Sequence, residues 1–222
     1  MRDTVTAEEN TTPRAAVRGV RYRAMDLVGA SVGLLLGWPV MLVAALVVRL
    51  TMGGPVLFRQ VRLGRDEQPF TLLKLRTMNG ARDPHGRLLP GATRLTRVGR
   101  WLRSLSIDEL PQLWNVLRGD MSLVGPRPLH PHYLPYYSAR ERLRHQVRPG
   151  MTGYAQVNGR NSLSWDERLE LDVQYVEGKS LLLDLRIVLC TVGKVVRRRD
   201  VGDRALQGSL ADYRGAQQQA RD

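Results

Sequence analysis

The chain has 222 residues, enough for one domain with its own hydrophobic core, and its formal net charge is +13, from 34 Lys and Arg against 21 Asp and Glu. This balance favours an anionic partner: nucleic acid, anionic lipid or a phosphorylated substrate. The single cysteine, Cys190, excludes an internal disulfide and a metal site built from cysteines. Aromatic residues make up only 6% of the chain and no basic and aromatic platform recurs, which disfavours a nucleic-acid binder.

A membrane segment is expected near the N-terminus. Residues 1–13 are polar and predict disorder. Residues 14–50 contain an uncharged, mostly apolar run (27–48) that is long enough for a helix across a bilayer core. A Gly-Trp-Pro sequence ending at Pro39 breaks the run, since proline disrupts a helix. Arginines flank the run on both sides and Lys and Arg mark the cytoplasmic side, so the pattern favours a re-entrant helix over a full span or a buried core helix.

A second domain is expected over residues 51–200, followed by a flexible, Gln-rich tail over 201–222. Two short apolar runs around a turn at residues 64–69 predict a β-hairpin. The Gly- and Pro-containing residues 81–93 predict a loop. The apolar run begins too late and is too long for a cleaved secretory leader, so this domain is expected in the cytoplasm.

Two helices are predicted towards the end of this domain. The first, residues 165–176, follows Ser164, which is a favourable N-cap. The second, residues 181–199, is amphipathic with a basic end. Two interpretations of its apolar face stay open: packing onto the domain core, or lying in the bilayer interface with arginines at anionic head groups. The apolar positions are Leu181, Leu185, Val188, Val192 and Val195.

The chemistry is concentrated in residues 106–128, where three carboxylates and two arginines alternate with Gly and Pro. One interpretation is purely structural: Ser106 and Glu109 have the spacing of a capping box at the start of a helix. The other is that the helix begins at Pro111, a favoured first position, which leaves Asp108 and Glu109 just ahead of its exposed amides. An ionised carboxylate in that place is able to act as a nucleophile or a metal ligand.

Several sequence blocks in the right order resemble the bacterial sugar transferase family, the monotopic phosphoglycosyl transferases. The resemblance covers roughly residues 20–200, with mild departures: Ile107 stands where leucine is usual, and Tyr154 where tryptophan is common. The matching blocks are residues 54–60, 74–78, 96–103, 106–128, 148–153 and 156–161.

This resemblance implies an α/β, α-rich monotopic membrane protein, with a re-entrant broken helix and a small catalytic domain that carries interfacial amphipathic helices. It implies transfer of a sugar-1-phosphate from a UDP-sugar to polyprenyl phosphate through a covalent aspartyl intermediate, at the cytoplasmic face of the inner membrane, as the first membrane step of exopolysaccharide or glycoconjugate synthesis. Asp108 is then the nucleophile, Glu109 assists it, and both are candidate ligands of Mg²⁺, with Asp120 as a further candidate. The expected substrate-binding residues are Arg76, Pro126, Arg127, Pro128, Arg148, Gln156 and Asn158.

The expected partners are the UDP-sugar, polyprenyl phosphate and membrane lipid, with no nucleic acid, and the resemblance allows a homodimer. Two other functions compete: a catalytically inactive scaffold of the same fold and a basic nucleic-acid-binding protein. The charged groups Asp108, Glu109, Arg127 and Arg148 argue against the scaffold, which would not require them. The sequence does not specify which sugar is transferred.

Overall fold

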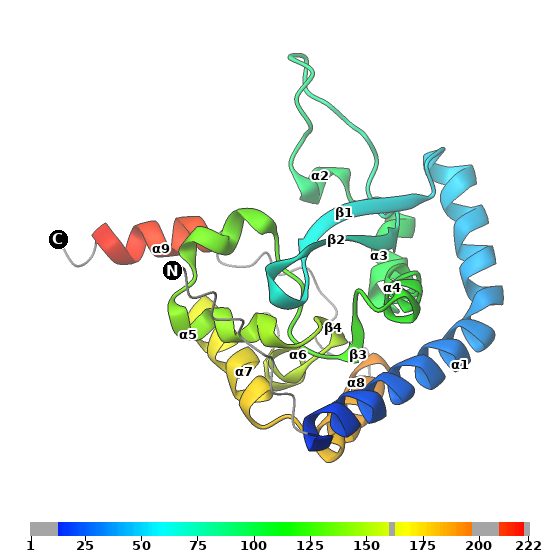
Figure 1. Ribbon diagram of the computed structural model, residues 1–222. Coiled ribbons are helices and arrows are strands. Elements are labelled where there is room, and N and C mark those ends of the chain that lie inside the picture. The colour runs from blue at the N-terminus through cyan, green and yellow to red at the C-terminus, as the bar shows by residue number, and fades with distance from the viewer. Residues whose placement is uncertain (1–12, 160–162, 197–208, 220–222) are drawn as a thin grey trace, which may run out of the picture.

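The computed structural model describes residues 13–159, 163–196 and 209–219. Within these ranges the protein is rich in helix and has two sheets of two strands each (Figure 1). The α-helices are α1 (Pro13–Met52), α2 (Gly91–Arg94), α3 (Arg97–Ser104), α4 (Gln112–Arg118), α5 (Ala139–Arg142), α6 (Tyr154–Asn158), α7 (Trp165–Glu177), α8 (Leu181–Val196) and α9 (Leu210–Gln219). The strands are β1 (Leu57–Leu63), β2 (Pro69–Leu75), β3 (Ser122–Val124) and β4 (Gly150–Thr152), and short 3-10 helices are η1 (Arg65–Glu67), η2 (Ile107–Glu109), η3 (Pro131–Tyr136) and η4 (Leu143–Gln146).

The N-terminal helix α1 has 40 residues and continues through Pro39 without interruption. The break predicted from the Gly-Trp-Pro sequence is therefore a change of direction along α1, which curves around one side of the domain (Figure 1). The part Gly19–Met52 is long and apolar enough to cross a membrane, judged by length and composition alone. Only 11% of its most apolar stretch is buried inside the protein, which contradicts the interpretation as a buried core helix.

The inner face of α1 comes close to the domain because it carries glycines. Gly29, Gly33 and Gly37 are four residues apart and therefore lie on one face of the helix. A Cβ atom on Gly29 would come within 2.5 Å of Leu123, and one on Gly33 within 3.1 Å of Leu113. Larger side chains would force the Leu123 and Leu113 side chains to move, so the glycines let α1 pack closely against β3 and α4.

Both halves of α1 are attached to the same domain. Near its N-terminal end the buried Asp26 carboxylate accepts hydrogen bonds from the Ser122 hydroxyl (2.8 Å) and the Leu123 amide (2.9 Å). Near its C-terminal end Val48 is fully buried in a cluster with Leu102 of α3. The domain therefore holds α1 at two points far apart along the helix.

The predicted β-hairpin is confirmed. Strands β1 and β2 pair antiparallel, with Leu57 opposite Leu75. The other edge of β2 is covered by the fully buried Asn115 of α4, whose side-chain oxygen accepts from the Leu73 amide (3.0 Å) and whose amide group donates to the Thr71 carbonyl (2.8 Å). One side chain thus satisfies backbone groups that a further strand would otherwise pair.

The two helices predicted near the end of the domain are confirmed as α7 and α8, and Ser164 does cap α7. Ser164 and Glu167 form a complete capping box. On α8 the buried positions are Asp184 and Ile187, whereas Leu185 and Val192 are more than half exposed. The interpretation as core packing is therefore confirmed only in part: Val188 of the predicted face packs against the core, and most of that face is exposed. Predicted helical residues beyond 196 lie outside the described ranges.

The C-terminal segment departs from the prediction of a flexible tail over 201–222. Residues 197–208 and 220–222 lie outside the described ranges, but residues 210–219 form α9, which is docked on the domain. Leu210 is fully buried beside Trp165, and the Tyr213 hydroxyl donates to the Asp166 carboxylate (2.8 Å). Because this segment is mostly polar and rich in Gln, its composition did not predict these few contacts with the domain.

Candidate active site

Asp108 and Glu109 lie in η2, directly ahead of α4. Ser106 has the left-handed backbone conformation (φ 55°) and its side chain makes no capping hydrogen bond, so the capping-box interpretation is wrong. Pro111 occupies the N-cap position of α4, within one residue of the predicted helix start. The alternative interpretation, with both carboxylates just before a helix that starts around Pro111, is therefore confirmed.

Glu109 is held by two cations. Its carboxylate is 2.7 Å from the Lys74 ammonium and 3.1 Å from the Arg127 guanidinium. Burial by itself would raise the pKa of Glu109, but Arg127 and Lys74 outweigh burial and hold this pKa well below its usual range. Glu109 is therefore ionised at every physiological pH and is paired with both Lys74 and Arg127.

Asp108 has the opposite environment. It is 6% exposed, and no described residue forms a hydrogen bond with its carboxylate. Burial and the neighbouring Glu109 charge raise the pKa of Asp108 to about 6, against the opposing effect of Lys74, Arg103 and Arg127. Asp108 is thus mostly ionised at neutral pH and has no partner within the described chain. Such a carboxylate is available to attack an electrophile.

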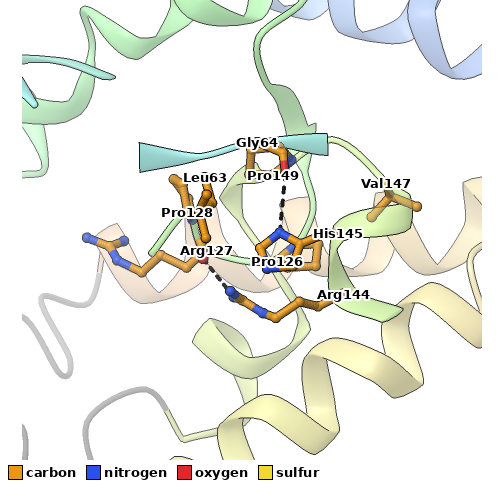
Figure 2. A pocket seen from close by; sticks show the side chains of 9 residues that line it. All are labelled: Leu63, Gly64, Pro126, Arg127, Pro128, Arg144, His145, Val147 and Pro149. Atoms are coloured by element: carbon orange, nitrogen blue, oxygen red, sulfur yellow. Dashed lines mark hydrogen bonds between the residues drawn. The ribbon is translucent and has the colours of Figure 1, made fainter. Parts of the chain in front are cut away.

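The backbone that carries Arg127 is fixed by a buried ion pair. Arg144 is 2% exposed, and its Nη2 atom donates to the Asp172 carboxylate (2.6 Å) and to the main-chain carbonyl of Arg127 (2.8 Å). Figure 2 shows this arrangement: the Arg127 side chain points away from the small pocket that Arg144 and His145 line. His145 contacts the Gly64 carbonyl from the same pocket (3.2 Å). The pocket therefore lies on one side of residues 126–128, and the Arg127 guanidinium extends to the other side, where it faces Glu109.

Further cations surround the carboxylate pair, and sequence reasoning did not single them out. Arg103 of α3 donates to the Thr77 hydroxyl (3.1 Å) and lies close enough to Asp108 to lower its pKa. The pKa of Arg62 falls to about 10, first through burial and then through the nearby Arg127 charge. Lys74 and Arg103 do fall within the family-like blocks, but only the fold shows that their charges meet at Asp108 and Glu109.

The structure brings together some of the predicted substrate-binding residues and separates others. Pro126 and Pro128 flank Arg127 beside the carboxylate pair. Arg76 instead donates to the carbonyls of Gly54 (2.8 Å) and Met78 (2.9 Å).

Arg148 donates through Nε to the Gly119 carbonyl (2.8 Å), at the end of α4 opposite to Asp108. Seven residues of helix separate the two ends by roughly 10 Å. Asn158 is exposed and bonds its own helix, whereas Gln156 is buried and its side-chain amide has no partner among the described residues.

The residues present fit a Mg²⁺ ion bound in part by substrate. No group of three or more His, Cys, Asp or Glu side chains that could hold a metal occurs in the described parts of the chain. Asp120, the further candidate, pairs with Arg118 (3.6 Å) at the far end of α4. Mg²⁺ commonly binds one or two carboxylates and completes its shell with substrate phosphates and water. Asp108, with uncommitted oxygens, suits that arrangement better than Glu109, which is already paired with two cations.

The chain belongs to the bacterial sugar transferase family, whose model matches residues 17–198. An uncharacterized sugar transferase of Bacillus subtilis, EpsL, is 54% identical over 174 residues, which are 78% of this chain and 86% of that protein. The UDP-glucose:undecaprenyl-phosphate glucose-1-phosphate transferase of Caulobacter vibrioides is 48% identical over 190 residues, which cover 81% and 71% of the two chains. The exopolysaccharide production protein ExoY of Rhizobium meliloti is 38% identical over 208 residues (86% and 92%). These relatives confirm that the chain is an enzyme of this family.

Proposed function

We propose that the protein transfers a sugar-1-phosphate from a UDP-sugar to undecaprenyl phosphate through an aspartyl intermediate on Asp108. Family membership and the names of the relatives support the overall reaction. The observation that carries the mechanism is the asymmetry of the carboxylate pair. Glu109 is committed to Lys74 and Arg127, whereas Asp108 is buried, largely ionised and without a hydrogen-bond partner in the described chain.

In the first step an oxygen of Asp108 attacks the phosphorus that bears the sugar. The bond from this phosphorus to the bridging oxygen breaks, and UMP leaves with the electron pair. In the second step a phosphate oxygen of the lipid attacks the same phosphorus, the acyl-phosphate bond breaks, and the Asp108 carboxylate is restored. The products are UMP and a polyprenyl diphosphate sugar, so atoms and charges balance over the two steps.

The cations have distinct roles in this scheme. Phosphoryl transfer depends on positioning and on neutralising the phosphate oxygens. Arg127 is anchored by Glu109 on its side chain and by Arg144 on its backbone, so it presents its guanidinium in a fixed place. Lys74 and Arg103 add positive charge beside Asp108. Mg²⁺ held by Asp108 and substrate phosphates would supply further neutralisation of the diphosphate.

The location proposed for this reaction is the cytoplasmic face of the inner membrane, with α1 re-entrant. Support comes from α1 itself: its outer face is apolar and exposed, while its two halves are fixed to one domain through Asp26 and Val48. A domain that holds both halves keeps both ends of the helix on its own side of a bilayer. A role in exopolysaccharide synthesis is proposed from the similarity to ExoY, and a homodimer stays a prediction.

The test is to incubate enzyme, Mg²⁺ and UDP-sugar without any lipid acceptor. We expect about one UMP per active site and a sugar-phosphate mass increment on the peptide that contains Asp108, as covalent catalysis requires. Asp108→Asn should abolish both signals, because an amide of nearly the same shape is a poor nucleophile. Asp120→Asn is the matched control and should keep them. UMP release that needs the acceptor and leaves no adduct would instead indicate direct transfer.

A further inference from the structure

A second group of cations lies at the end of α4 opposite to the carboxylate pair. Arg23 of α1 donates to the carbonyls of Val116 (2.6 Å) and Leu117 (2.7 Å), and Arg148 donates to the carbonyl of Gly119 (2.8 Å). Gly119 closes α4 in the left-handed conformation (φ 93°), and the Arg23 guanidinium lies 3.6 Å from the position that a Cβ of Gly119 would occupy. Two guanidinium groups therefore meet at one residue.

Lys179 extends this group. Its ammonium lies over the Tyr22 ring (4.6 Å), and the Tyr22 hydroxyl donates to the Lys179 carbonyl (3.4 Å), directly beside Arg23 in the sequence. Arg65 is exposed. Burial lowers the pKa of both Lys179 and Arg148, and the positive charge of Arg65 lies close enough to lower the pKa of each further. We call Arg23, Arg65, Arg148 and Lys179 the Arg148 cluster.

The acids near this cluster do not offer it a full set of partners. Asp26 is buried and its oxygen accepts from Ser122 and Leu123. Asp184 is buried and accepts from the Tyr175 hydroxyl (2.8 Å). Arg65 is paired with Asp66 (3.2 Å), so the other three cations face two buried carboxylates that already accept hydrogen bonds from neutral donors.

Hydrogen bonding to the last carbonyls of α4 explains only part of this cluster of cations. The carbonyls at the end of α4 are expected to attract cations, and Arg23 uses both terminal nitrogens for them. Arg148 uses only Nε. Among the described residues its two terminal amino groups have no partner, although the guanidinium is half-buried beside another arginine. A planar fork of this kind suits bidentate binding of phosphate oxygens.

The surroundings indicate what carries the phosphate. Apart from Arg21, the large side chains of α1 that are exposed beside Arg23 are apolar: Val20, Leu27 and Val28. In a bilayer, cations at the end of such a helix lie at the level of the head groups. A lipid acceptor bound here would have its phosphate about one length of α4, roughly 10 Å, from Asp108. A structural lipid fits this distance better than a reacting one.

We propose that Arg148, with Arg23, Arg65 and Lys179, binds the phosphate of an anionic phospholipid head group. The site lies where the N-terminal half of α1 leaves the apolar layer. It fixes this end of the helix and the adjoining end of α4 at the membrane surface. Because no catalytic step is involved, the site is independent of the transfer reaction proposed above.

The test measures lipid binding to the purified full-length chain in detergent, by native mass spectrometry and without substrates. Phosphatidylglycerol is the anionic probe and phosphatidylcholine the matched neutral-charge probe. We expect selective retention of one phosphatidylglycerol, weakened about tenfold or more in Arg148→Gln, the loss for a charged hydrogen bond. Lys179→Gln should weaken retention too. Arg87→Gln, the same change on an exposed loop arginine paired with Asp83, should leave retention unchanged.

Since Arg148 also caps α4, each variant is checked by its thermal unfolding temperature. Lys179→Gln carries the test should Arg148→Gln fail to fold, because within the described chain the close contacts of the Lys179 ammonium are with the Tyr22 and Tyr175 rings. Retention equal to wild type in folded Arg148→Gln or in Lys179→Gln overturns the site, as does equal retention of both lipids. Displacement by millimolar inorganic phosphate would assign a soluble anion instead, and tighter retention of undecaprenyl phosphate would assign the acceptor.

Discussion

At the scale of single residues, Asp108 and Glu109 show how neighbours in a chain acquire different chemistry. Both are shielded from water, yet Glu109 has two cationic partners at hydrogen-bond distance and Asp108 has none in the described chain. Burial therefore dominates at Asp108, and attraction to Lys74 and Arg127 dominates at Glu109. Pairs of titratable groups whose pKa values are pushed apart are typical of catalytic sites.

The pH dependence of the first step should follow Asp108. Only the ionised carboxylate attacks phosphorus, and its pKa is raised to about 6 by burial and by Glu109. Single-turnover UMP release without acceptor should therefore fall as pH decreases, with a midpoint near 6 rather than near the ordinary value for aspartate, about 4. Rapid-quench measurements between pH 5 and 8 test this. A rate that stays constant down to pH 5 would contradict the raised pKa.

Stability should respond oppositely to changes at the two carboxylates. A pKa that is raised in the folded state means that ionised Asp108 destabilises the fold as pH rises through about 6. Asp108→Asn should therefore increase the free energy of unfolding at pH 7, by up to about 2–3 kcal/mol. Glu109 has a lowered pKa, so its contribution is present at pH 7 and is lost only in strong acid.

Glu109→Gln should accordingly lower stability at pH 7, because it leaves Lys74 and Arg127 without their counter-charge. Thermal unfolding of both variants in one detergent checks the pair. Equal shifts of the same sign would show that the two carboxylates do not differ in environment. An inactive but more stable Asp108→Asn variant would also separate the catalytic role of this residue from a structural one.

Arg127 should contribute through the geometry of its guanidinium as well as its charge. Arg127→Lys keeps the charge but loses the planar fork. We expect kcat/KM to fall by an amount equivalent to about 1.5–3 kcal/mol, the range for a hydrogen bond to a charged group. Arg87→Lys, on an exposed loop, is the control and should be neutral. An unchanged kcat/KM in Arg127→Lys would show that Arg127 only pairs with Glu109.

At the scale of secondary-structure elements, Asn115 joins α4 to the hairpin. Its side chain bonds the free edge of β2 at Leu73 and Thr71 and also contacts Asp120 (3.1 Å). Asn115→Ala should lower the free energy of unfolding by at least about 2 kcal/mol, because it leaves buried backbone groups unpaired. The control is Asn158→Ala on the exposed end of α6, where a change below about 0.5 kcal/mol is expected. A loss at Asn115 no larger than that at Asn158 would contradict this role.

The elements also show where sequence reasoning succeeds and fails. Local signals were sufficient for the β1–β2 hairpin and for α7, since the turn and the Ser164 cap act within a few residues. The face of α8 could not be assigned, because Ile187 and Leu185 are equally apolar and only the position of the core distinguishes them. The helix α9 was missed because its attachment depends on a few residues such as Leu210.

At the scale of the whole molecule, the site also depends on contacts between distant parts of the chain, which the sequence does not indicate. The sequence marked Asp108, Glu109 and Arg127, because they lie within one block of chain. It did not reveal that Lys74 is the partner of Glu109. The two residues are 35 positions apart in the chain, and the packing of β2 brings them together. Sequence reasoning grouped Arg148 with the same site from the family resemblance and the chemistry of arginine, whereas the fold puts that arginine at the other end of α4. Residue types are readable from sequence, but long-range proximity is not.

The attachments of α1 to the domain restrict how this helix can lie in a membrane. The helix curves, its outer side is apolar, and Asp26 and Val48 attach its two halves to one domain (Figure 1). A full span would require one half to detach, breaking either the buried Asp26 contacts or the cluster around Val48. Both losses are costly, since one leaves a buried carboxylate without partners and the other exposes a core cluster to water.

Single cysteines introduced at the two ends of α1, after replacement of Cys190, should therefore be labelled by a membrane-impermeant maleimide from the same side of sealed vesicles. Suitable positions are Arg21 and Thr51, both exposed. Pro39→Ala removes the residue that weakens the helix ladder at its centre and should straighten α1, so labelling from opposite sides should increase. Cysteine on the exposed loop at Arg87 provides the reference for the domain side. Opposite-side labelling of the two ends with Pro39 intact would mean that α1 spans the bilayer and that its contacts at one end open on insertion.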